Sequence, residues 1–149
     1  MSQQNSKQSS TIMEVEKKEA ALQALFETFD QGFLKLPSQN ISFSEISWSK
    51  HPAFEGVELK HIVTAKDTQR QFSYHLVRIA PGKSIGNHTH ETQLETHEVI
   101  AGSGICIHES AVIPYEPGTI SILPAGIPHE VNAKETGLYL FAKFMPALC

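Results

Sequence analysis

The chain has 149 residues, a length typical of one folded domain with a short extension. It is 40% hydrophobic and 19% charged, which excludes collagen-like, coiled-coil and wholly disordered chains. The formal net charge of −4 argues against a general polyanion-binding protein, so we expect no nucleic-acid partner.

Apolar runs and cysteines point to an ordinary soluble chain. No apolar run approaches the ~20 residues of a membrane span, and the N-terminus lacks the apolar core of a secretory signal. Two cysteines, Cys106 and Cys149, are too few for a disulfide framework. We therefore expect a cytoplasmic protein with no membrane partner. The unusual count is that of histidine, with eight in the chain.

The N-terminal part divides into a polar segment and a helical one. Residues 1–11 are mostly Ser, Gln, Asn, Lys and Thr, which predicts a mobile tail. Residues 12–37 are expected to contain a helix, because Thr11 and Glu14 have the spacing of a capping box. Apolar side chains then recur at steps of three and four, which predicts a stripe that packs on the domain or on a second subunit: Leu22, Leu25, Phe26, Phe29 and Phe33.

Residues 38–149 have the pattern of a β-domain. Short β-branched and aromatic runs end at Pro, Gly, Asn or Asp, as is typical of an all-β antiparallel sandwich or barrel. The expected strands are 41–48, 57–64, 71–80, 95–101, 104–108, 119–123, 129–132 and 138–144. Both faces of the last of these are apolar, so we expect its outer face to be covered by the N-terminal helix or by another protomer.

A cluster of potential metal ligands lies in this β-domain. Residues two apart in an extended segment point to the same face, so His88 and His90 present two imidazoles side by side. Glu95 begins the next strand, and His129 follows a Pro- and Gly-containing turn. Three imidazoles and one carboxylate suit one divalent transition-metal ion, such as Zn, Ni, Fe, Mn or Cu. Calcium would require mostly oxygen ligands.

The spacing around these residues resembles the two motifs of the cupin superfamily. The first motif, G-x5-H-x-H-x4-E-x6-G, is met by this set: Gly82, His88, His90, Glu95 and Gly102. The second motif, G-x5-P-x-G-x2-H-x3-N, is similar to this set: Gly118, Pro124, Gly126 and His129. Ala133 stands in place of the final Asn, and Asn132 lies one residue earlier.

The resemblance implies a cupin double-stranded β-helix, a jelly-roll-like barrel, here with an N-terminal helical extension. It also implies that the ion lies inside one open end of the barrel, with one or two positions left for water or substrate. Because small cupins commonly dimerise, we expect a homodimer.

Two main classes of function remain open from the residues alone, besides a third possibility, a structural cupin with an incidental metal. The first is a metal-dependent enzyme acting on a small polar metabolite, of the isomerase, lyase or dioxygenase type. The second is a non-catalytic module that binds or senses a small ligand. In neither class do the residues identify the ligand or the metal.

His97 is the candidate catalytic residue, because it lies two residues after Glu95 and shares its inward face. It either orients a metal ligand, transfers a proton, or is a hydrogen-bonded barrel residue without a chemical role. For His75 and His108 either face of the strand is a possible interior face. His51 and His61 resemble ordinary strand or loop residues.

Overall fold

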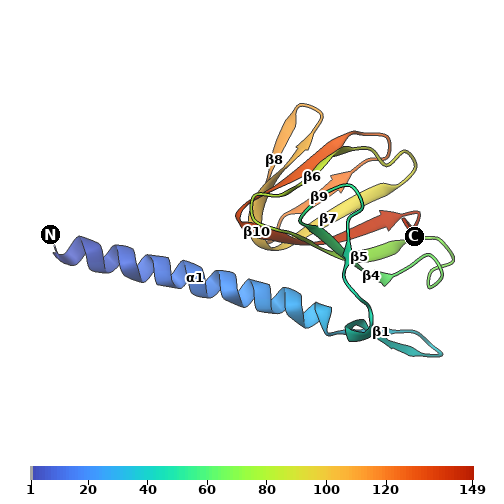
Figure 1. Ribbon diagram of the computed structural model, residues 1–149, viewed down its shortest axis with the longest axis horizontal. Helices are drawn as coiled ribbons and strands as arrows, with labels where there is room; N and C mark the ends of the chain where they lie inside the picture. The colour runs from blue at the N-terminus through green and yellow to red at the C-terminus, as the bar shows by residue number, and fades with distance from the viewer. Residues whose placement is uncertain (1) are drawn as a thin grey trace.

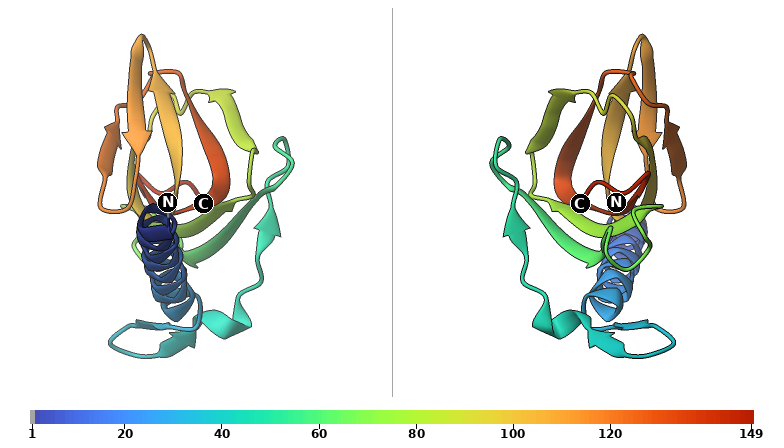
Figure 2. Two further views of the ribbon diagram at one scale, coloured as in Figure 1. Left: turned by 90° about the vertical axis from the view of Figure 1, so that its left-hand side faces the viewer. Right: turned by 90° about the vertical axis from the view of Figure 1, so that its right-hand side faces the viewer.

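The computed structural model describes residues 2–149, with side chains from Lys7 onward. One long helix, α1 (Ser2–Asp30), lies along one wall of a β-barrel, and its N-terminal half extends beyond that wall (Figure 1). Figure 2, which views the molecule along the helix, shows α1 beneath the barrel. No helix within the described residues is both long and apolar enough to cross a membrane.

The remaining elements are strands and one turn of 3₁₀ helix. They are β1 (Phe33–Lys35), β2 (Asn40–Ser42), η1 (Phe43–Glu45), β3 (Ser49–Lys50), β4 (Val57–Val63), β5 (Ser73–Ile79), β6 (Ser84–His88), β7 (Leu94–His108), β8 (Ala111–Tyr115), β9 (Ile120–Leu123) and β10 (His129–Met145). β1 and β2 form a separate hairpin. The others form one antiparallel sheet in the order β3-β4-β5-β10-β7-β8, with β6 paired to β10 and β9 paired to β7.

The two longest strands, β7 and β10, each span two of the strands expected from the sequence. Gly102 does not break β7. It takes a φ of +78°, where a Cβ would collide with the carbonyl oxygen of Gly137. The register between β7 and β10 shifts at this point, between Ala133 and Leu138. The glycine therefore bends the strand pair while both strands continue, as a bulge does.

The helix differs from its expected range at both ends. Residues 2–11, expected to form part of a tail, are helical, and the helix ends at Asp30 instead of continuing to residue 37. The sequence did not predict this, because residues 2–11 have no apolar period, which a helical segment that extends past the barrel does not need. At the other end the Gly32 N–H bonds the Phe29 carbonyl oxygen, and the chain turns into the β1–β2 hairpin. The mobility of residues 1–11 and the domain boundaries remain predictions.

The helix covers the outer face of β10. The ring of Phe26, which is 2% exposed, lies 5.1 Å from that of Tyr139 and 6.0 Å from that of Phe141. Gln23 Nε2 also donates a hydrogen bond to the Tyr139 hydroxyl at 3.1 Å. This confirms the helix as the cover of that face, although Leu25 and Phe29 of the expected stripe stay exposed. The homodimer remains a prediction.

Candidate metal centre

Four side chains from three parts of the barrel meet at one of its ends. His88 ends β6 and is paired in register with His129, the first residue of β10. His90 lies in the loop after β6, and Glu95 is the second residue of β7. One potential ligand atom from each of the four lies within 4.8 Å of the others. The structure thus brings together all four residues expected from the sequence to bind a metal.

Backbone hydrogen bonds fix the orientation of two of the imidazoles. His88 Nδ1 lies 2.8 Å from the Gly86 carbonyl oxygen, and His129 Nδ1 lies 3.2 Å from that of Ile127. A carbonyl only accepts, so each Nδ1 carries the hydrogen, and in the neutral ring Nε2 carries a free lone pair. This is the usual arrangement of a histidine prepared to bind a metal.

Two buried atoms at the centre lack a hydrogen-bond partner among the described residues: Glu95 Oε2 and His129 Nε2. They lie 3.0 Å apart without the alignment of a hydrogen bond, and His90 Nε2 lies 3.5 Å from the same oxygen. A carboxylate oxygen and a free imidazole lone pair are both acceptors, so their approach is unfavourable unless a cation lies between them. The donor set and its orphaned atoms therefore fit a divalent transition metal.

Ionisation at the centre also suits metal binding. Burial lowers the pKa of His88 and of His90, so both rings are neutral at neutral pH. Burial alone would lower the pKa of His129, but the adjacent Glu95 carboxylate outweighs burial and raises it. For Glu95 burial opposes ionisation, yet His97 and His129 overcome it and hold the carboxyl pKa well below its usual range. The Glu95 carboxylate is therefore ionised at neutral pH, as a metal ligand must be.

His97 and Tyr115 hold the Glu95 carboxylate through a chain of hydrogen bonds. The 2%-exposed His97 ring places Nε2 2.6 Å from Glu95 Oε1, and its Nδ1 lies 2.8 Å from the Tyr115 hydroxyl. Burial raises the pKa of Tyr115, so the phenol keeps its proton and donates a hydrogen bond to Nδ1. His97 Nε2–H then donates to Oε1 and leaves Oε2 directed toward the three imidazoles.

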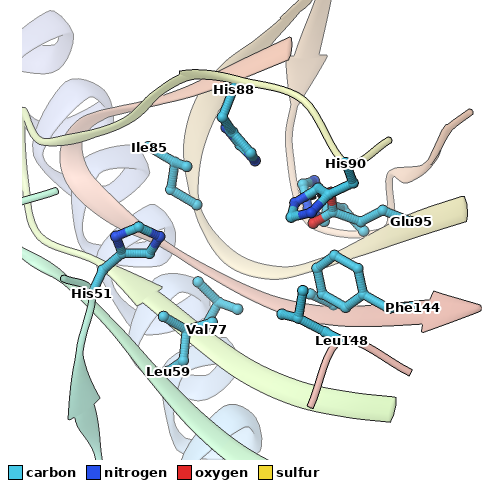
Figure 3. A pocket seen from close by; sticks show the side chains of 11 residues that line it. His51, Leu59, Val77, Ile85, His88, His90, Glu95, Phe144 and Leu148 are labelled. Atoms are coloured by element: carbon cyan, nitrogen blue, oxygen red, sulfur yellow. Dashed lines mark hydrogen bonds and ion pairs between the residues drawn. The ribbon is translucent and has the colours of Figure 1, made fainter. Parts of the chain in front are cut away.

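A small pocket of about 70 Å³ opens beside the four potential ligands. Figure 3 shows His88, His90 and Glu95 on one side of it and His51 on the other, across a floor that includes Leu59 and Val77. His97 also lines the pocket. The pocket thus has a polar wall at three of the four potential ligands, and apart from His51 and His97 the rest of its lining is apolar.

The structure places His51 in the pocket lining, whereas the sequence predicts an ordinary strand or loop residue there. Its Nδ1 accepts hydrogen bonds from the backbone N–H groups of Ala53 at 3.1 Å and Phe54 at 3.3 Å. The proton is therefore on Nε2, and that edge of the ring faces the pocket (Figure 3). Phe54 stacks on the ring and packs against Gly86, where a Cβ would be too close. In the sequence, only the position of His51 directly before Pro52, where a turn is favoured, indicated that backbone N–H groups could bond this ring.

The other histidines lie outside this pocket lining. His75 is buried behind the pocket and contacts His61, while His108 is half-buried on β7. Cys106 is fully buried in the barrel core.

Comparisons with known proteins agree with this architecture. The cupin domain family matches residues 75–142. A solved structure of a predicted oxalate decarboxylase from Thermotoga maritima is 22% identical, with a TM-score of 0.61 over 69% of this chain and 95% of that one. KdgF from Halomonas sp. is 19% identical, with a TM-score of 0.61 over 69% of this chain and 90% of that one.

A third similar structure is that of a longer protein. Bacillus subtilis oxalate decarboxylase is 22% identical, with a TM-score of 0.63 over 73% of this chain but only 29% of that one. At these identities the structural likeness shows the fold alone. The comparison with curated proteins gave no match.

The barrel and the four converging side chains define a β-barrel protein with a potential metal centre at one open end. The matched family makes this class specific: the chain contains a cupin domain and has the cupin fold, with one added N-terminal helix.

Proposed function

We propose that the protein binds one divalent transition-metal ion through His88, His90, Glu95 and His129, and acts on a small polar metabolite at that ion. The observation that carries the proposal is the pair of buried, unpartnered atoms, Glu95 Oε2 and His129 Nε2, which approach to 3.0 Å without a hydrogen bond. The similar oxalate decarboxylase from Bacillus subtilis has Mn(II) centres. For this chain the ligand set suits Zn, Ni, Fe, Mn or Cu, so the metal remains open.

The pocket restricts the size and chemistry of the ligand. A volume of about 70 Å³ holds roughly five waters, which corresponds to a molecule of a few heavy atoms. One end of the ligand meets the metal centre, and the other meets the Nε2–H of His51, which can only donate. A small carboxylate, hydroxy acid or enolate has oxygens at both ends, so we favour that class.

The residues around the pocket would have separate roles in the reaction. A bound ion would supply Lewis-acid stabilisation of negative charge that develops on a substrate oxygen. His51 would hold a second substrate oxygen through its Nε2–H. Leu59, Val77 and Phe144 would exclude water from the reacting end.

His97 contributes by positioning. Its Nε2–H holds Glu95 Oε1 while Tyr115 fixes its tautomer, so both ring nitrogens are already engaged. These contacts favour the orienting role over proton transfer among the alternatives that the sequence leaves open.

The hydrogen bonds of His97 and His51 also support a second candidate, a binding or sensing function. Among the side chains that line the pocket, His97 has both nitrogens engaged and His51 presents a donor. Neither residue is therefore a free general base. Many enzymes need such a base, whereas a sensor does not.

Metal content tests the first part of the proposal. Protein produced without an affinity tag should contain a stoichiometric ion that the His88→Ala/His90→Ala variant loses, whereas a His108→Gln control retains it. A wild-type protein whose His88/His90 centre stays empty in metal-replete medium would overturn the proposal. Turnover of small keto and hydroxy acids by Mn-, Fe- and Ni-loaded protein then separates the two functions. Tight binding without turnover in every metal form would select the sensor.

A further inference from the structure

A second group of metal-binding side chains lies outside the barrel pocket. His61 on β4 and His75 on β5 are paired in register, and the thiol of Cys149 lies beside them. One ligand atom from each lies within 4.8 Å of the other two. His61 Nδ1 is 2.7 Å from His75 Nδ1 and 3.7 Å from Cys149 Sγ.

Backbone contacts hold Cys149 at this position. The Ala147 N–H bonds the Arg70 carbonyl oxygen at 3.1 Å, the Leu148 N–H bonds Ser73 Oγ at 2.9 Å, and the Ala65 N–H bonds the Cys149 carbonyl oxygen at 2.6 Å. Three successive residues are thereby tied to the β4–β5 region. The thiol thus approaches the two imidazoles from an anchored segment, which lowers the entropy cost of using it as a ligand.

Ser73 orients the buried imidazole of the group. His75 is fully buried, and its Nε2 lies 2.8 Å from Ser73 Oγ, which turns Nδ1 toward His61. A hydrogen-bonded outer nitrogen and an inward ligand nitrogen are the usual arrangement of a metal-binding histidine. Burial lowers the pKa of His75 to about 3 and also lowers that of His61, so both imidazoles are neutral and available at neutral pH.

The distances are close to those of a tetrahedral zinc site. Zn–N bonds of about 2.05 Å and a Zn–S bond of about 2.3 Å place two nitrogens about 3.3 Å apart and nitrogen and sulfur about 3.5 Å apart. The distance of 3.7 Å between His61 Nδ1 and Cys149 Sγ is close to the second of these values. The two nitrogens must separate by about 0.6 Å, which the half-exposed His61 can provide.

From this geometry we infer that His61, His75 and Cys149 form a second metal site, of the His2Cys type, for a thiophilic ion of the Zn(II) class. The thiol loses its proton to solvent when the ion binds, and the fourth coordination position faces the solvent side of the exposed Cys149. The site is separate from the barrel centre, since the Phe144 ring lies between His75 and His90, 5.5 Å from one and 5.0 Å from the other. Leu148 lines the barrel pocket, so an ion here would also fix one wall of that pocket.

Cobalt(II) is a suitable probe, because its bond to a thiolate gives a charge-transfer absorption that histidine and carboxylate ligands do not give. The His88→Ala/His90→Ala variant, which lacks the barrel centre, should bind about one Co(II) per chain with this absorption, and Zn(II) should remove it. Cys149→Ser should abolish the absorption, and His61→Ala should weaken Co(II) binding at least tenfold. Cys106→Ala, the matched control at the other cysteine, should leave both unchanged.

Absence of the charge-transfer absorption, or its persistence in Cys149→Ser, would overturn the inference and leave His61–His75 as a simple hydrogen bond. If the double variant does not fold, the count is made on the wild-type protein. Two zinc ions per chain falling to one in Cys149→Ser supports the second site, and an unchanged count refutes it. Loss of the other ion in a His129→Ala variant reports on the barrel centre separately.

Discussion

His129 Nε2 lies 3.0 Å from Glu95 Oε2 in the barrel interior, and neither atom has a hydrogen-bond partner in the part of the chain that the structure describes. The Ile127 carbonyl holds the His129 ring through Nδ1, and His97 holds the Glu95 carboxylate through Oε1. Neither side chain can turn away without breaking a buried hydrogen bond. The positive charge that this pair requires comes from a proton on His129 or from a metal ion. The proton and the metal ion therefore compete for His129 Nε2.

This competition predicts how metal affinity depends on pH. The pKa of His129 is raised in the metal-free protein, whereas those of His88 and His90 are lowered. From pH 6.5 upward the ion therefore displaces one proton, and affinity should rise by up to tenfold per pH unit until His129 is neutral. Calorimetry of the Cys149→Ser variant, which lacks the thiol of the second site, counts the protons released at the barrel centre in buffers of different ionisation enthalpy. A flat profile above pH 6.5, or the release of two protons, would contradict this assignment.

Removal of His97 should weaken metal binding without removing a ligand. In His97→Ala the Glu95 carboxylate loses its hydrogen bond at Oε1 and can rotate, so we expect a 10–100-fold loss of metal affinity. In His97→Gln an amide N–H can replace the Nε2–H donor and should restore part of the loss. Binding titrations and the EPR spectrum of the Mn(II)-loaded protein measure both effects. Equal affinity in all three proteins would show that His97 does not position Glu95.

The sequence predicted the four potential ligands more completely than the pocket around them. His88, His90, Glu95 and His129 follow a fixed spacing on strands and turns, so local geometry brings them together. His51 enters the pocket only because β3 and the following turn lie across the barrel end, and His61 meets His75 only through strand register. Such contacts depend on tertiary structure, which a linear pattern does not contain. The helical conformation of residues 2–11 was likewise not predicted, because this polar segment lacks an apolar period.

His51 should affect ligand binding but not metal binding. Asn at this position can still accept the Ala53 and Phe54 N–H groups through its side-chain oxygen, as Asn does in turns, but is too short to donate into the pocket. His51→Asn should therefore weaken binding of a small carboxylate to the metal-loaded protein about tenfold, the value of one hydrogen bond. Metal content should stay unchanged. Unaltered carboxylate affinity would exclude His51 from ligand recognition, and loss of metal would indicate a structural role instead.

Gly102 should be far more sensitive to substitution than Gly82, another glycine with positive φ. Gly102→Ala places a Cβ against the backbone of Gly137 where β7 and β10 bend together, and neither strand can shift without breaking the sheet. Gly82 is the matched control, with a φ of +69° but no atom within 4 Å of an added Cβ. Gly82→Ala should lower the free energy of unfolding by about 1 kcal/mol, the cost of a left-handed alanine. Gly102→Ala should lower it by about 3 kcal/mol or more, because the steric clash adds to that cost. Urea unfolding midpoints measure the difference, and equal losses in the two variants would show that β7 and β10 do not need the close approach at Gly102.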